Sequence, residues 1–414
     1  MNIQNTGPNT GSRVLSRFEL IAIAAALMAL NALAIDVMLP ALPAMGEALG
    51  IINENDRQLV ITVYMLGFGF AQIFFGPLAD RFGRRGPLLC GLVVYVGVAF
   101  AAIWAPTYGA LLALRLLQGM GAAATRVIAT AVVRDCYSGR VMAEIMSLVF
   151  MVFMIIPIVA PAIGQLLLAF GPWWTIFLFM SGLALIISVW VYFRLPETLA
   201  EENRRSLSVR SITSAFVIVV TNRMAMSYTL AGAFMFGSLL GFVSTAQQVY
   251  VGIYELGVWF PLAFAGTAGL MALASFLNAR VVGRYGMRRI SHFAILVMIA
   301  ASAIWVAVSL LGPVPFWAFF IFLSINMFLF SWVISNANSL SMEPLGAVAG
   351  TASGVIGFIQ IVTGALLGMG IGQLFDGTIT PTTISYLLMG ICALLAMLYG
   401  EKGKLFGVGT EHLD

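Results

Sequence analysis

Three charged residues interrupt long apolar stretches of the 414-residue chain, and their side chains have the clearest potential for chemistry. Asp36 lies in the first apolar stretch, and Arg115 and Arg126 both lie in the fourth. An ionisable group in apolar sequence is costly unless it has a function, so these positions predict a site for protons or a ligand. A carboxyl group can exchange a proton, whereas a guanidinium group stays charged and can hold an anionic partner.

The composition explains why these three charges stand out. The chain is 61% hydrophobic and 9% charged, with 21 Lys and Arg residues and 17 Asp and Glu residues. A soluble protein of this length would carry about 100 charged residues. This deficit excludes a soluble enzyme, a nucleic-acid-binding protein and a disordered chain. We predict an all-α protein that spans a membrane many times and has the lipid bilayer as its solvent.

The apolar stretches that position these charges are long enough for spanning helices, which need about 20 residues each. Twelve spans are predicted, at residues 17–43, 57–78, 86–104, 108–133, 142–168, 174–193, 224–246, 257–279, 290–310, 315–337, 347–373 and 383–400. We predict an N-terminal six-helix bundle at 1–195 and a C-terminal one at 223–414. The polar linker between them, 196–222, is predicted to be cytoplasmic and to contain a short helix on the membrane surface.

Basic residues are distributed unevenly between the two ends of these spans. If the N-terminus is cytoplasmic, all Lys and Arg residues except Arg57, Arg115 and Arg126 fall at cytoplasmic ends or loops. Positive charge favours the cytoplasmic side. We therefore predict a multi-pass protein of a bacterial-type inner membrane with both termini in the cytoplasm. The three cysteines lie in or beside apolar segments and predict no disulfide framework.

An internal repeat supports the division into two halves. The segment G-P-L-A-D-R-F-G-R-R (76–85) ends the second span, and the weaker copy A-R-V-V-G-R-Y-G-M-R (279–288) ends the eighth, 203 residues later. The first copy resembles the signature of the major facilitator superfamily. This resemblance implies two pseudo-symmetric six-helix bundles and transport of a small molecule by alternating access.

The residues of this signature predict a latch on the cytoplasmic side. Gly76 and Gly83 permit a close approach of helices and a tight turn. Asp80 can face the start of the eleventh span, and Arg84 can pair with Asp135 at the end of the fourth. The predicted gating residues are Gly76, Asp80, Arg81, Gly83, Arg84, Arg85 and Asp135.

Three further segments resemble the drug:proton antiporter branch of that superfamily, namely A-I-D-V-M-L-P-A-L-P (34–43), L-R-L-L-Q-G-M-G-A-A (114–123) and I-I-P-I-V-A-P-A-I-G (155–164). With V-V-R-D (132–135), they look most like the bicyclomycin/chloramphenicol-resistance exporters. The third segment resembles a motif of antiporters rather than symporters, although Ala160 and Gln165 depart from its usual form. Its predicted motif residues are Pro157, Pro161 and Gly164.

Helix geometry suggests how the charges are arranged. Counting about 1.5 Å per residue places Asp36 and Arg115 at the same depth, so we predict that they pair. Asp36 would bind the proton, and Arg115 would keep it ionised until a proton arrives from outside. Arg126 shares the helix face of Arg115, with the more cytoplasmic Glu144 as its candidate partner. The predicted substrate cavity contains Asp36, Tyr64, Arg115, Gln118, Ala122, Arg126, Tyr228, Phe234 and Met235.

The resemblance implies a monomeric, proton-coupled exporter of drugs or small amphipathic compounds, driven by the proton gradient without a cofactor or a metal. An exporter or importer of one metabolite on the same fold stays open as an alternative. An integral-membrane enzyme is a distant alternative, because the sequence has no metal-ligand cluster, nucleophile elbow or phosphate loop. His292 is predicted to be an interfacial residue near the inner end of the ninth span.

Overall fold

The computed structural model describes residues 16–137, 139–204 and 209–407, and every regular element in these ranges is helical. The α-helices are α1 (Arg17–Asp36), α2 (Leu42–Ala48), α3 (Leu59–Phe82), α4 (Arg85–Ala101), α5 (Tyr108–Cys136), α6 (Gly139–Phe170), α7 (Thr175–Arg194), α8 (Val209–Thr221), α9 (Arg223–Gln247), α10 (Phe260–Tyr285), α11 (Met287–Leu311), α12 (Phe316–Met342), α13 (Ala349–Gln373) and α14 (Thr380–Gly400). Short 3₁₀ or π turns flank several of them.

Twelve helical segments of the described chain are long and apolar enough to cross a membrane, which confirms the predicted number of spans. Some helices are longer than predicted. α3 continues to Phe82 and α10 to Tyr285, and each ends where a glycine takes a positive φ, +86° at Gly83 and +82° at Gly286. A glycine in this conformation is a common helix stop, so the two halves of the repeat end their helices in the same way.

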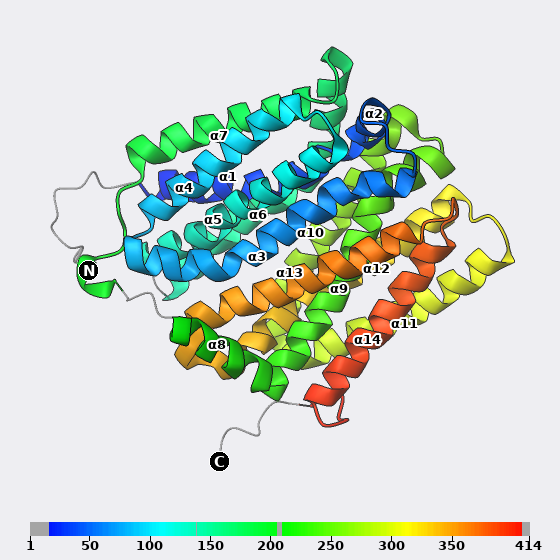
Figure 1. Cartoon of the computed structure of the whole chain (residues 1–414). Helices are drawn as coiled ribbons and strands as arrows, with labels where there is room; N and C mark the ends of the chain where they lie inside the picture. Colours follow the sequence, from blue (N-terminus) through cyan, green and yellow to red (C-terminus); the bar gives the residue numbers. More distant parts are fainter. Residues whose placement is uncertain (1–15, 138, 205–208, 408–414) are drawn as a thin grey trace.

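The helices form two bundles that lie side by side (Figure 1). α1 and α3–α7 pack mainly against one another, and so do α9–α14. The most extensive packing between the bundles is that of α3 on α13 and of α6 on α10. The observed pairing gives the predicted all-α architecture of two six-helix bundles; the exact domain boundaries stay a prediction.

Large apolar side chains cover the outward faces of the helices. Examples from both bundles are Val93, Phe193, Leu310 and Leu395, each more than half exposed. Such a surface would cause aggregation in water, but it is the expected surface of a protein surrounded by lipid tails. The exposed apolar residues therefore agree with a multi-pass membrane protein.

The bundles have two distinct ends. At one end, which we call the basic end, α1 begins at Arg17 and α14 ends at Gly400. The opposite end, which we call the far end, contains the 3₁₀ helix Glu54–Gln58. The predicted linker helix is α8, which packs against α9 and α13 at the basic end (Figure 1). Its contact is made by Val219, which is buried in an apolar cluster with residues of both helices.

Candidate functional site

Asp36 is the last residue of α1, and only 7% of its surface is exposed. The helix ends here because the next residues, V-M-L-P-A-L-P, contain Pro40 and Pro43, which lack the N–H donor of a helix interior. The carboxylate makes no hydrogen bond or ion pair with another residue in the described ranges. An ionised carboxylate without a partner is costly in a buried position, so Asp36 is well placed to exchange a proton.

Arg115 does not pair with Asp36, which corrects the sequence prediction. Its guanidinium donates to the carbonyl oxygens of Ala34 at 2.8 Å and Val60 at 3.1 Å, and to Oε1 of Gln118 at 2.7 Å. The carbonyl of Ala34 is in the last turn of α1 and lacks a helical partner, because α1 stops at Asp36. Arg115 therefore caps the broken end of α1 rather than neutralising the carboxylate beside it.

The surroundings of Arg115 form a buried polar network between α1, α3 and α5. The guanidinium lies over the ring of Tyr64, 4.4 Å from the centroid, and Arg115 is fully buried. The hydroxyl of Tyr64 donates to Oδ1 of Asn31 at 3.3 Å, and Nδ2 of Asn31 donates to Thr125 at 2.8 Å. Sequence reasoning missed Asn31 and Thr125. This network fixes α1 against its neighbours near the helix break.

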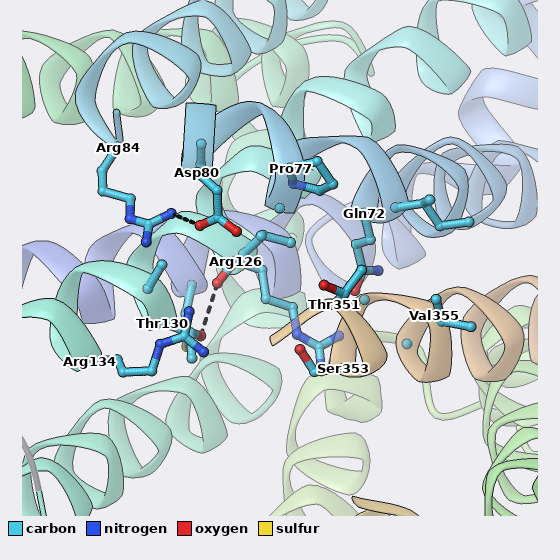
Figure 2. Close-up of a pocket in the computed structure, with 18 of the residues that line it drawn as sticks. Gln72, Pro77, Asp80, Arg84, Arg126, Thr130, Arg134, Thr351, Ser353 and Val355 are labelled. Carbon is cyan, nitrogen blue, oxygen red and sulfur yellow. Dashed lines mark hydrogen bonds and ion pairs between the residues drawn. The ribbon is translucent and has the colours of Figure 1, made fainter. Parts of the chain in front are cut away.

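A cavity of about 270 Å³ lies between α3, α5 and α13, nearer to the basic end (Figure 2). Its polar walls are formed by Gln72, Asp80, Arg84, Arg126, Thr130, Arg134, Thr351 and Ser353, and its apolar walls include Met28, Ile73, Pro77, Phe150 and Val355. Of the nine residues predicted for the substrate cavity, Arg126 alone lines this space.

The other predicted cavity residues lie elsewhere, in packed positions. Tyr64, Gln118 and Ala122 are buried between helices of the N-terminal bundle with Arg115. Met235 is fully buried in α9, and Phe234 packs against the apolar core. The sequence shows which residues share a helix, but the face that a helix turns to its neighbours depends on tertiary packing.

A stripe of α5 faces the cavity with a regular spacing. Arg126, Thr130 and Arg134 are four residues apart, so they lie on one side of the helix and all line the cavity. This spacing was the sequence signal that would have found Thr130 and Arg134. Glu144, the predicted partner of Arg126, forms an ion pair with Arg17 instead, at 2.7 Å.

The predicted pair of Arg84 and Asp135 is present at the basic end. Nε of Arg84 donates to Asp135 at 2.7 Å, and Nη1 donates to Asp80 at 2.5 Å. Burial disfavours the charged guanidinium, but the hydrogen bonds to Asp135 and Asp80 outweigh it and raise the pKa of Arg84 above its ordinary value. All three residues belong to the N-terminal bundle, so these contacts stabilise that bundle and do not join the two halves.

Glu197, which follows α7, completes this cluster and was missed by sequence reasoning. Its carboxylate accepts hydrogen bonds from the backbone N–H groups of Arg84 at 2.7 Å and Arg85 at 3.1 Å. A side chain at Gly83 would collide with this carboxylate, and Gly83 also has a positive φ, so the turn requires glycine. Arg81 contacts the ring of Phe82.

The predicted antiporter motif lies directly against the helix break. Pro157 and Pro161 are inside α6, and Gly164 packs on the carbonyl group of Val37, the residue after Asp36. A Cβ atom at position 164 would collide with that carbonyl oxygen. The motif thus lets α6 approach the backbone next to the buried carboxyl group.

The C-terminal bundle has its own charged cluster at the basic end. Nε of Arg288 donates to Glu401 at 2.9 Å, and its Nη2 donates to Glu343 at 3.2 Å. The Tyr228 hydroxyl donates to Glu401 at 2.8 Å and lies 3.1 Å from Nε2 of His292. Tyr228 therefore does not line the cavity. His292 lies near the start of α11, as predicted, and its side chain is fully buried.

The two bundles are joined by hydrogen bonds at the far end. Gln58 donates to Oε1 of Gln248 at 2.6 Å, and Gln248 donates to Oδ1 of Asn55 at 2.9 Å. Nδ2 of Asn55 donates to the carbonyl of Phe375 at 2.8 Å, and Nε2 of Gln373 donates to the carbonyl of Asn55 at 3.1 Å. These polar contacts close the far end, whereas the cavity separates the bundles nearer to the basic end.

Comparison with known proteins agrees with this architecture. A family model described as Major Facilitator Superfamily matches residues 24–369. The chain belongs to the Major Facilitator Superfamily. It is 31% identical to a bicyclomycin resistance protein homolog of Haemophilus influenzae, over 92% of this chain and 95% of that protein. It is 30% identical to a chloramphenicol resistance protein of Pseudomonas aeruginosa, over 92% and 87% of the two chains.

A D-xylose-proton symporter has the same fold as this Major Facilitator Superfamily protein, with a TM-score of 0.73 over 94% of this chain and 99% of that chain, at 14% identity. The bacterial relatives confirm the resemblance to drug-resistance exporters that the segments 34–43, 114–123 and 155–164 carry. The protein is therefore a multi-pass membrane transporter that moves small molecules, and its superfamily is not an enzyme family.

Proposed function

We propose that this protein exports small amphipathic drugs from a bacterial cell in exchange for protons, by alternating access. The observation that carries this proposal is the buried, unpaired carboxylate of Asp36 at the break of α1, with the antiporter-motif glycine of α6 packed on the next residue. The drug-resistance relatives support the substrate class. The proton gradient would supply the energy, and no cofactor is needed.

The direction of transport depends on how the protein lies in the membrane. The positive-inside rule assigns the basic end, with Arg84, Arg85, Arg134 and Arg288, to the cytoplasm of a bacterial inner membrane. The cavity would then be nearer to the cytoplasm, where a drug enters, and the hydrogen-bonded far end would face outward and be closed. This arrangement corresponds to the inward-facing state of an alternating-access cycle.

Proton coupling would act through the broken helix. Arg115 is fixed on the carbonyl of Ala34, and Asp36 forms no ion pair with any residue that the structure describes. The ionised and protonated forms of Asp36 would therefore favour different packing of α1 against α6. Protonation from outside would favour one orientation of the bundles, and proton release to the cytoplasm the other. Arg115 is then a positioning residue, because it holds the helix end that carries Asp36.

The test compares Asp36→Asn with Asp376→Asn, which changes an exposed carboxylate in the loop after α13. Both variants and the wild type would be expressed in a host that lacks its own exporters, and a drug-susceptibility panel including bicyclomycin and chloramphenicol would be measured. Everted vesicles would report proton release on drug addition. We expect Asp36→Asn to lose both signals and Asp376→Asn to retain them. Full proton-driven export by a well-folded Asp36→Asn protein would refute the assignment.

A further inference from the structure

We propose that the cavity between α3, α5 and α13 binds the anionic group of a transported compound, a carboxylate or a group of the same charge, through Arg126 with the support of Arg134. This inference rests on the proposed transport function, because it names the substrate class of the same protein. It goes beyond that function by assigning a charged subsite on the inner half of α5.

The charge balance of the cavity wall is the first argument. Among the lining residues, Asp80 is an acid and Arg84, Arg126 and Arg134 are bases. The carboxylate of Asp80 is engaged by Arg84, which also binds Asp135. Neither Arg126 nor Arg134 forms an ion pair with a carboxylate in the part of the chain that the structure describes. Two positive charges at the cavity therefore lack an anionic partner.

The position of Arg126 is the second argument. Its guanidinium group extends from α5 across the cavity toward Ser353 of α13, and Arg134 enters from the same helix (Figure 2). Gln72 and Thr351 line the same cavity and carry polar groups that can hydrogen-bond a bound compound. The apolar side chains of Met28 and Val355 would contact the body of the compound. A cavity of about 270 Å³ is suited to part of a drug-sized molecule rather than to a metal ion.

The chemistry of the guanidinium group decides between ligand classes. Arginine does not release its proton in proteins, so Arg126 cannot act as a proton carrier, and its charge stays constant through a transport cycle. A fixed positive charge in the cavity wall attracts a carboxylate and repels a cationic compound. A charge this far inside a spanning helix is also costly without such a role.

The first experiment measures the electrostatic potential of the cavity without any assumed substrate. Thr130→Cys would be introduced into a cysteine-free background that carries Cys90→Ser, Cys136→Ser and Cys392→Ser. The rates at which this cysteine reacts with two methanethiosulfonates would then be compared, the anionic sulfonatoethyl and the cationic trimethylammonioethyl reagent. The ratio of the anionic to the cationic rate is divided by the same ratio measured for free cysteine in the same buffer. We expect a bias of about tenfold toward the anionic reagent, as a nearby unit charge would produce.

Substitution of the arginine tests the source of this bias. Arg126→Gln should remove most of it and Arg126→Lys should preserve it, whereas Arg280→Gln, which changes an exposed arginine of α10, should have no effect. A ratio equal to that of free cysteine, or one that Arg126→Gln leaves unchanged, overturns the proposal. Because Arg126→Lys keeps both charge and bulk, it separates a loss of charge from a failure to fold.

The second experiment uses a matched pair of ligands, chloramphenicol and its succinate ester, which adds a carboxylate to the same body. Binding to the purified protein in nanodiscs should be about tenfold tighter for the succinate, and Arg126→Gln should abolish the difference. Equal binding, or binding of neither compound, overturns the carboxylate subsite. Drug resistance in cells is measured separately. A cavity that favours anionic reagents in a protein that does not export drugs would contradict the exporter assignment alone. Drug export by a protein whose cavity shows no preference for anionic reagents would contradict the subsite alone.

Discussion

The side-chain amide of Gln58 donates a 2.6 Å hydrogen bond to Oε1 of Gln248, 190 positions later in the chain and in the opposite bundle. Both side chains are buried or nearly so, and Gln248 continues the contact to Asn55. At the basic end, by contrast, the described hydrogen bonds of Arg84 and of Arg288 stay within their own bundles. The polar contacts at the far end therefore add to the packing of α3 on α13 and of α6 on α10 in holding this orientation of the two bundles.

Weakening this far-end contact should shift the equilibrium between the two orientations. Gln58→Ala removes the hydrogen bond to Gln248 and a longer one, of 3.4 Å, to the carbonyl of Gly372. A net loss of about 1 kcal/mol corresponds to a change of about fivefold in the population ratio. The basic-end cavity would then be open less often, so Thr130→Cys in the cysteine-free background should react up to about fivefold more slowly with a thiol reagent. Ser302→Ala, which removes a hydrogen bond inside the C-terminal bundle, is the control. Equal rates in the two variants would contradict this role.

The contact between Gly164 and the backbone of Val37 predicts a position-specific effect of alanine. Gly164→Ala forces α6 away from the break of α1 and should cost about 1–3 kcal/mol, with loss of transport. Gly182→Ala in α7 is the matched control, because no atom lies within 4 Å of a Cβ there. That substitution should be neutral or stabilise by up to about 1 kcal/mol through helix propensity. Thermal unfolding in detergent compares them, and a similar melting temperature for both would count against the contact.

The sequence predicted the parts of the fold that depend on local pattern. Hydropathy placed all twelve spans, and the repeated signature predicted the turn at Gly83 and the pair of Arg84 with Asp135. The depth count placed Arg115 near Asp36 correctly, because the guanidinium reaches the carbonyl of Ala34, but depth alone does not decide which nearby group it binds. The prolines end α1 at Asp36, so the carbonyl of Ala34 lacks a helical partner and accepts a hydrogen bond from the guanidinium.

Other features depend on contacts that no local pattern encodes. The hydrogen bonds of Gln58 to Gln248 and of Asn55 to Phe375 join residues 190 and 320 positions apart in the chain. Amides in a loop between spans carry no signal of such distant partners. The assignment of Tyr228 to the cavity failed for a related reason. Its position within α9 was clear, but the direction of its side chain depends on the packing of α9 against α11 and the end of α14.

A double-mutant cycle should reveal coupling between Arg84 and Asp135. Their side chains are 5% and 14% exposed, so this pair is better shielded from water than an ordinary surface salt bridge. Arg84→Gln and Asp135→Asn should each destabilise the protein, and the double variant should lose less than the sum, with a coupling of about 1–2 kcal/mol. Unfolding in mixed detergent and sodium dodecyl sulfate gives the free energies. Strict additivity would show that the pair contributes no interaction of its own.

The cluster of the C-terminal bundle predicts unequal roles for its two acids. Glu401 is 12% exposed and accepts from both Arg288 and Tyr228, whereas Glu343 is 42% exposed and accepts from Arg288 alone. Glu401→Gln should therefore lower the free energy of unfolding by about 1–3 kcal/mol, because it weakens charge-assisted bonds in a shielded position. Glu343→Gln should cost no more than about 1 kcal/mol, since water already surrounds that pair. Unfolding measurements on the two variants under identical conditions check the order, and an equal or larger loss for Glu343→Gln would show that the exposed acid is the main partner of Arg288.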